Sequence, residues 1–215
     1  MKMLRIAPAS AGRLASLGLL LLVFAQTAAA LPAAPQTRVQ RFYTTLLNTM
    51  KAGPQLGSGG RYAKLAPVVA RTFDVPFMAR LAVGPAWSTL SPSQQQQVSA
   101  AFQRYISATY ADRFDNYSGE QLQVLGQAPY GSGVIVETRI VKSSGKPVTI
   151  NYMMRQGAQG AWQISDVYLD GTISQLATQR SEFHSILQRS GVDGLIATLN
   201  RKTDLLTSKT GNSSS

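Results

Sequence analysis

One carboxyl group stands where the sequence could support acid–base chemistry. Asp166 lies between Ile164 and Tyr168, inside a stretch whose alternating residues predict a half-buried strand. A carboxylate in such a strand must be hydrogen-bonded or paired, since burial otherwise raises its pKa. Beside Tyr105 or Tyr152, Asp166 could form an acid–base pair. The structural alternative is an ion pair with an arginine or a hydrogen bond to a nearby turn, and we favour it.

Few other side chains could do chemistry. The sequence has no cysteine and one histidine, His184, which excludes disulfides, thiol nucleophiles, cysteine-ligated metals and multi-histidine metal sites. The sequence has no cysteine partner for His184 and no motif that makes a serine its nucleophile, so we predict a surface or capping role for it. The glycine-rich stretches 57–60 and 144–147 lack either the Gly-Lys-Ser/Thr ending or the following helix of a phosphate loop. We therefore predict no catalytic residue, no metal and no cofactor.

The first thirty residues predict export. Lys2, Arg5 and Arg13 precede an apolar run at 14–24, and the alanines up to Ala30 offer a cleavage site. The run is shorter than the roughly 20 residues that span a bilayer, so we predict cleavage after Ala30 and not a retained anchor. Cleavage lowers the formal charge from +11 to +8.

The excess of basic residues suggests an anionic partner. The chain of 215 residues has 21 lysines and arginines, spread along the sequence and not clustered. Together with export, this spread argues against nucleic acid. Contact with an anionic membrane surface stays open, and so does charge that only keeps the protein in solution.

The elements that must position these residues are helices, then strands, then helices again. Apolar residues recur at helical spacing over 36–51, 61–73, 75–83, 92 to about 118, and after Gly171 with a corner at 191–194. Asp74 and Ser91 are the predicted caps of the third and fourth helices, and Gln94 completes a capping box with Ser91. Gly53-Pro54 is predicted to stop the first helix, and 57–60 to form a flexible loop.

Between the helices, polarity alternates with a period of two, which is typical of strands. The four segments lie around 122–124 and over 134–141, 148–155 and 161–169. Short turns connect the last three, so we predict an antiparallel meander whose apolar face, the even-numbered residues of the second and third strands, packs on helices. We predict one α+β domain over 31–207 and a disordered tail at 208–215. Periodicity alone does not distinguish a pocket from a filled core.

Several motifs, in this order and spacing, resemble the MlaC family of toluene-tolerance periplasmic proteins. They are Phe73-Asp74-Val75-Pro76-Phe77-Met78-Ala79-Arg80, Gly84-x-x-Trp87, the Ser91-Pro92-x-Gln94 helix start, Tyr152, Trp162-Gln163-Ile164-x-Asp166-Val167 and Gly171-x-x-Ser174. The likeness covers residues 36–206. Residues 166–183, DVYLDGTISQLATQRSEF, and 117–120 resemble more closely the branch associated with hopanoid biosynthesis, HpnM.

The resemblance implies a periplasmic lipid carrier in which an NTF2-like, four-stranded antiparallel sheet and its helices enclose an apolar cavity. Such a carrier shuttles phospholipid, or hopanoid-type lipid in the HpnM branch, between an inner-membrane ABC transporter complex and an outer-membrane lipoprotein complex, with transient membrane contact. It needs no cofactor. Two alternatives stay open: an NTF2-like isomerase or dehydratase that uses Asp166, and an envelope adaptor without a ligand.

In such a carrier the lipid tails would lie between the even-numbered sheet face and the helices, with the head group near the rim. We expect the tails to contact apolar and aromatic residues, namely Met78, Leu81, Trp87, Phe102, Tyr105, Val136, Ile140, Ile150, Tyr152, Met154 and Ile164. Candidates for contact with the head group or a partner are Arg80, Arg139 and Arg155, with a solvated surface as their alternative role. A hopanoid cargo would favour a wider pocket and less reliance on arginine.

Overall fold

The computed structural model describes residues 34–143 and 145–209. The predicted leader at 1–30 and residues 210–215 of the predicted tail lie outside the described residues. Within the described part of the chain, no helix is long and apolar enough to cross a membrane.

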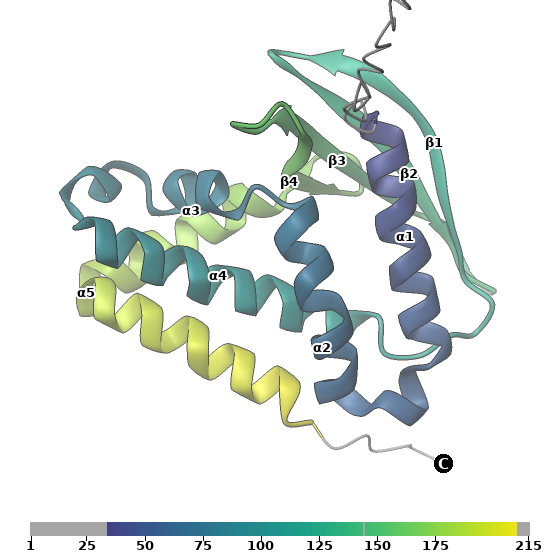
Figure 1. Ribbon diagram of the computed structural model, residues 1–215, viewed down its shortest axis with the longest axis horizontal. Coiled ribbons are helices and arrows are strands. Elements are labelled where there is room, and N and C mark those ends of the chain that lie inside the picture. Colours follow the sequence, from purple (N-terminus) through teal and green to yellow (C-terminus); the bar gives the residue numbers. More distant parts are fainter. Residues whose placement is uncertain (1–33, 144, 210–215) are drawn as a thin grey trace, which may run out of the picture. The chain divides into compact units, whose positions relative to one another are not determined.

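The predicted meander is present (Figure 1). One very short strand is added at its edge. The strands of the sheet are β1 (Gln121–Tyr130), β2 (Gly133–Val141), β3 (Val148–Gln156), β4 (Trp162–Leu169) and β5 (Ile173–Ser174). They pair in sequence order, and every pairing is antiparallel. The α+β class is confirmed, but the predicted count of four strands becomes five because residues after the Asp170-Gly171 turn fold back onto β4.

The even-numbered residues of β2 and β3 form the inner face of the sheet, as the period of two predicts. Val136, Thr138 and Tyr152 have no exposed surface, whereas Glu137 and Thr149 on the other face are exposed. Successive side chains of a strand point to opposite faces, so one face can be apolar throughout while the other meets water.

A β-bulge at Ser165 reverses this parity in β4. Met154 pairs with Ile164 but Met153 pairs with Asp166, which leaves Ser165 as the extra residue. One inserted residue moves every later side chain to the opposite face. As a result Val167 and Leu169, which pair with Tyr152 and Ile150, join the inner face although their numbers are odd.

The helices are α1 (Pro35–Lys51), α2 (Gly53–Thr72), α3 (Val75–Val83), the 3-10 helix η1 (Gly84–Thr89), α4 (Pro92–Arg113) and α5 (Gln175–Thr207). Helix α1 packs along the sheet, against β1, β2 and β4. Helices α4 and α5 lie side by side, and α3 packs on both of them (Figure 1). All of them share one apolar core, whose largest fully buried side chains include Phe42, Tyr43, Phe73 and Phe183.

The predicted helix starts are confirmed at Asp74 and Ser91. The Asp74 carboxylate accepts a hydrogen bond from the Phe77 N–H at 3.3 Å. Ser91 and Gln94 form both halves of a capping box, with the Gln94 N–H donating to Ser91 Oγ at 3.2 Å and the Ser91 N–H to Gln94 Oε1 at 2.9 Å. These bonds satisfy helix N–H groups that have no partner inside the helix. Helix α4 ends at Arg113, earlier than predicted.

The predicted end of the first helix before Gly53-Pro54 is confirmed, since α1 ends at Lys51, but the predicted loop at 57–60 is wrong. Gly53 and Pro54 open α2, where proline suits the first turn because its missing N–H is not needed there. The stretch 57–60 is part of α2, with a kink at Gly57, whose φ of 61° favours glycine. A similar non-helical Gly191, φ 64°, forms the corner predicted inside the last helical region.

Candidate functional site

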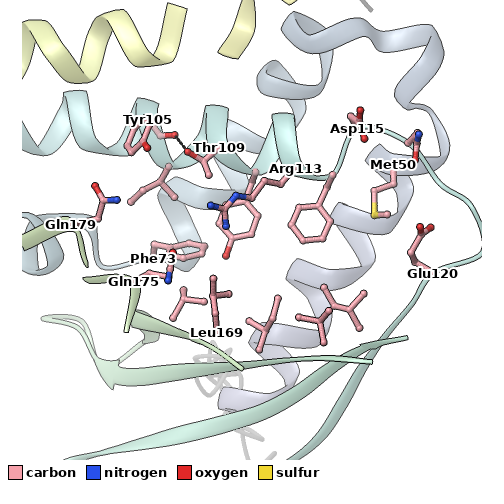
Figure 2. Close-up of a pocket in the computed structure, with 18 of the residues that line it drawn as sticks. Met50, Phe73, Tyr105, Thr109, Arg113, Asp115, Glu120, Leu169, Gln175 and Gln179 are labelled. Atoms are coloured by element: carbon pink, nitrogen blue, oxygen red, sulfur yellow. Dashed lines mark hydrogen bonds between the residues drawn. The ribbon is translucent and has the colours of Figure 1, made fainter. Parts of the chain in front are cut away.

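A cavity of about 450 Å³ lies between α4 and the inner face of the sheet (Figure 2). Its lining residues come from α1, the end of α2, α4 and the segment after it, the strands β2 to β4 and the start of α5. They are Met50, Phe73, Phe102, Tyr105, Ile106, Thr109, Tyr110, Arg113, Phe114, Asp115, Asn116, Glu120, Ile140, Lys142, Val148, Ile150, Val167, Leu169, Gln175 and Gln179. This size falls in the range of small-molecule sites.

The walls of the cavity are mostly apolar. Ile140, Ile150 and Val167 form the sheet side, and Phe102 and Ile106 belong to α4 on the opposite side. Side chains at i and i+4 share one helix face, so the spacing of Phe102 and Ile106 aims both at the sheet. Such walls favour hydrocarbon over water.

Tyrosine hydroxyls lie behind the apolar wall. The Tyr43 hydroxyl donates to Thr138 Oγ1 at 2.5 Å, and the Thr138 hydroxyl in turn donates to the Ile150 carbonyl. Tyr152 is fully buried, and its hydroxyl has no hydrogen-bond partner among the described residues. Burial, and then the neighbouring Tyr110 and Tyr43, raise the pKa of the Tyr152 hydroxyl well above its ordinary value. Burial likewise raises the pKa of Tyr110. These hydroxyls therefore stay neutral at physiological pH.

One end of the cavity is charged and exposed. This end, the mouth, consists of Arg113, Asp115, Asn116, Glu120 and Lys142, from the end of α4, the segment after it and the residue that follows β2. Within residues 34–143 and 145–209, none of its four charged side chains forms a salt bridge. The mouth therefore presents two cationic and two anionic side chains to a ligand that enters the cavity.

A close backbone approach positions the mouth. A Cβ at Gly53 would lie 1.9 Å from the Asp115 carbonyl oxygen, so only glycine allows α2 to begin against this segment. Arg61 strengthens the junction, since its Nε donates to the Ala111 carbonyl at 2.8 Å and its Nη1 to the Gly53 carbonyl at 3.2 Å. The end of α4 and the start of α2 are thereby held together, and the mouth with them.

The opposite end, which we call the inner end, is polar but uncharged. It consists of Tyr105, Gln175 and Gln179, all half-buried. Thr109 stands beside them, but its hydroxyl donates to the Tyr105 carbonyl at 2.8 Å (Figure 2). The Gln179 Oε1 atom is buried and has no hydrogen-bond partner among the described residues.

Comparison with known proteins identifies the family. The family model described as MlaC protein matches residues 40–201, which is most of the chain. The chain belongs to the MlaC family. A curated relative from Haemophilus influenzae, the intermembrane phospholipid transport system binding protein MlaC, is 25% identical over 118 residues. That match covers 53% of this chain and 55% of the relative, so the chain spans about half the length of the curated relative.

A solved structure extends the likeness to the fold. It is the phospholipid-binding protein from Ralstonia solanacearum, in complex with a phospholipid, at 25% sequence identity and a TM-score of 0.68. The match covers 81% of this chain and 99% of the other. The family resemblance that the sequence motifs predict is thus confirmed, and the assignment to the HpnM branch stays a prediction.

The structure distributes the predicted tail-contact residues of this MlaC family member over three environments. Four line the cavity: Phe102, Tyr105, Ile140 and Ile150. Five are buried in the core outside the lining: Met78, Val136, Tyr152, Met154 and Ile164. Trp87 in η1 is half-buried, and Leu81 on α3 is 36% exposed.

The predicted arginines lie away from the cavity. Arg155 pairs with Asp74 and stacks on Phe77, 4.2 Å from its ring centroid, so it joins β3 to the start of α3. Arg80 is exposed on α3, and Arg139 lies on the outer face of β2.

The two basic residues that line the cavity, Arg113 and Lys142, were missed by sequence reasoning. The spacing of both residues from inward-facing neighbours could have indicated their position at the cavity. Lys142 follows Ile140 by two residues along the strand direction, and Arg113 follows Thr109 by one helical turn.

Asp166 is a structural cap. Its Oδ1 accepts hydrogen bonds from the Val167 N–H at 2.7 Å and the Leu176 N–H at 3.0 Å, and its Oδ2 accepts from the Ser174 hydroxyl at 2.6 Å. Ser174 in turn accepts from the Ala177 N–H as the N-cap of α5. Asp166 is absent from the cavity lining, and the bond to a nearby turn, the structural alternative, is what the structure shows.

Proposed function

We propose that this protein is a lipid carrier that holds the apolar part of its cargo in the cavity and the head group at the mouth. The observation that carries the proposal is a cavity of about 450 Å³ with apolar walls and one charged, exposed end. The phospholipid-bound relative from Ralstonia solanacearum supports the same function.

The size of the cavity indicates how much hydrocarbon it could shelter. A methylene group takes up about as much space as a water molecule in the liquid, roughly 30 Å³, so the cavity corresponds to about 15 methylene groups. Each buried methylene contributes about 0.8 kcal/mol, so complete filling would stabilise the bound lipid by on the order of 10 kcal/mol. One acyl chain fits this volume, and a second chain would require the helices to move away from the sheet.

The mouth suits a polar head group. Arg113 and Lys142 can contact a phosphate or another anionic group, and Asp115 and Glu120 can contact an ammonium group. These four residues take the role that the sequence suggested for Arg80, Arg139 and Arg155. Exposed charges interact weakly with a ligand, so they should orient the head group while the apolar walls supply most of the affinity.

We place this carrier in the periplasm, where it would pass phospholipid or hopanoid-type lipid between an inner-membrane ABC transporter complex and an outer-membrane lipoprotein complex. The predicted leader at 1–30 supports export, and the name of the Haemophilus influenzae relative supports an intermembrane route. The location of Asp166 favours the carrier over an Asp166-dependent enzyme, and the unfilled volume favours it over a ligand-free adaptor.

Native mass spectrometry and lipid extraction of the exported protein test the proposal. Ile106→Trp should block the cavity, because this half-buried residue lines it, whereas Ile135→Trp adds the same bulk on the outer face of β2. We expect lipid to co-purify with the unaltered protein and with Ile135→Trp, and to be largely lost from Ile106→Trp. The extracted lipid identifies the cargo. Lipid-free protein, or equal lipid content in the two variants, would refute the carrier function.

A further inference from the structure

The inner end of the cavity contains a polar atom that the protein itself leaves without a partner. Gln179 lies on the first part of α5, and its Oε1 is buried with no hydrogen bond among the described residues. Buried polar atoms almost always have a partner, because an unpaired one loses its hydration without compensation. Since Gln179 also lines the cavity, a ligand is the natural source of the missing bond.

The surroundings of Gln179 are suited to a neutral polar group. Gln175 precedes it by one helical turn, so both amides lie on the same face of α5, and Tyr105 faces them from α4 (Figure 2). Thr109 is already engaged with the Tyr105 carbonyl. The charged lining residues come from other segments, the end of α4, residues 115–120 and the residue that follows β2. None of the three inner-end residues is itself charged; the cation that contacts Tyr105, Lys202, lies 5.4 Å from the Tyr105 ring centroid and is paired with Glu182.

We propose that the inner end recognises a hydroxyl group on the apolar body of the cargo, so that the preferred ligands are hydroxylated lipids. The inference rests on the proposed carrier function and adds a specificity-determining residue, Gln179, to it. A hydroxyl both donates and accepts, so it can bond to the Gln179 amide whichever way the amide is turned. A plain methyl terminus leaves the amide unpaired.

Two single-chain probes of matched length isolate this interaction: palmitic acid and ω-hydroxypalmitic acid. Palmitic acid has about as many methylene groups as the cavity can hold, so we expect the far end of the chain to reach the inner end when the carboxylate lies at the mouth. Dissociation constants for both probes are measured by isothermal titration calorimetry on the delipidated protein, Gln179→Met and Gln175→Met. Methionine keeps the length of the side chain and removes the amide. The ratio of the two constants is compared between proteins, which cancels the different hydration of the probes.

We expect the ratio to favour the hydroxylated probe about tenfold more in the unaltered protein than in Gln179→Met. The Gln175→Met variant is the matched control, because its amide lines the same cavity without a buried unpaired atom, and it should keep most of the preference. Thermal melting of both variants checks that they fold.

Three results would overturn the inference, and they can be told apart. An unchanged ratio in Gln179→Met, with both probes bound, removes hydroxyl recognition and leaves the carrier function intact. Equal loss of preference in Gln175→Met assigns the effect to the general polarity of the inner end and not to Gln179. Failure of all three proteins to bind either probe would reject the carrier function and the inference together.

Discussion

Replacement of Asp166 separates a structural role from a catalytic one. Asp166 is 8% exposed and accepts three hydrogen bonds, of which those from the Leu176 N–H and the Ser174 hydroxyl join β4 to the start of α5. Its charge also lies at a helix N-terminus, where the helix dipole favours an anion. If this junction is the role of Asp166, its loss should lower the free energy of unfolding and leave lipid binding unchanged.

The structure gives the size of the effect for two variants. Asp166→Ala leaves the Val167 and Leu176 N–H groups and the Ser174 hydroxyl without their acceptor. Hydrogen bonds to a charged group contribute about 1.5–3 kcal/mol each and are not additive, so we expect a loss of about 4 kcal/mol. Asp166→Asn can keep both N–H bonds through its amide oxygen and loses the charge, so we expect a loss of about 1–2 kcal/mol.

Urea unfolding followed by circular dichroism measures these losses, and lipid extraction from the same samples measures the cargo. Equal stability of Asp166→Asn and Asp166→Ala, or a loss of less than about 1 kcal/mol in Asp166→Ala, would refute this structural role of Asp166. If Asp166→Asn kept its stability but lost a measurable turnover, the acid–base hypothesis would be restored.

Three further variants test the burial of the Tyr152 hydroxyl, the capping box of α4 and the close approach of Gly53 to Asp115 that positions the mouth. Burial raises the pKa of Tyr152, so above pH of about 10 the unfolded chain loses a proton that the folded protein keeps, and stability falls as the pH rises. Tyr152→Phe should preserve the free energy of unfolding at neutral pH and make its decrease above pH of about 10 shallower by up to about 1.4 kcal/mol per pH unit, as measured by urea unfolding. An unchanged dependence of stability on pH would contradict this expectation. Ser91→Ala removes one half of the capping box and should lower the free energy of unfolding by about 1 kcal/mol, as measured by thermal unfolding. An unchanged melting temperature would contradict this expectation. Gly53→Ala puts a Cβ 1.9 Å from the Asp115 carbonyl, so we expect a loss of about 2 kcal/mol or more and a displaced mouth with less bound lipid. Full stability and lipid content in Gly53→Ala would show that the contact does not hold the mouth.

The helices and strands are largely predictable because they depend on local patterns. Period-two alternation places Val136 and Tyr152 on the buried face, and short-range capping chemistry places the starts of α3 and α4. The end of α1 before Gly53 was predicted correctly, but the predicted loop at 57–60 is wrong because glycine and proline have two uses. They end helices in most sequences, but here proline begins α2 and Gly57 forms a kink that the helix survives.

The composition of the site depends on two features beyond local pattern. The bulge at Ser165 exists only through pairing with β3, and it brings Val167 and Leu169 to the cavity against their parity. The mouth is assembled from separate segments, among them the end of α4 and the residue that follows β2, so Arg113 and Lys142 meet only in the folded protein. Four of the lining residues could be predicted from the sequence, because Phe102 and Tyr105 lie on the inward face of α4 and Ile140 and Ile150 have the even numbers of the inner face of β2 and β3.

The sequence by itself determines which side of each element faces inward, that one histidine and no cysteine leave little scope for chemistry, and the membership of the MlaC family that its motifs predict. It does not determine how far α4 stands from the sheet. Only the tertiary structure decides that distance, because α2, α3 and α5 each pack on both α4 and β4 and leave a cavity where the same side chains could have met in a filled core. The same inward apolar residue serves as core or as cavity wall depending on that spacing.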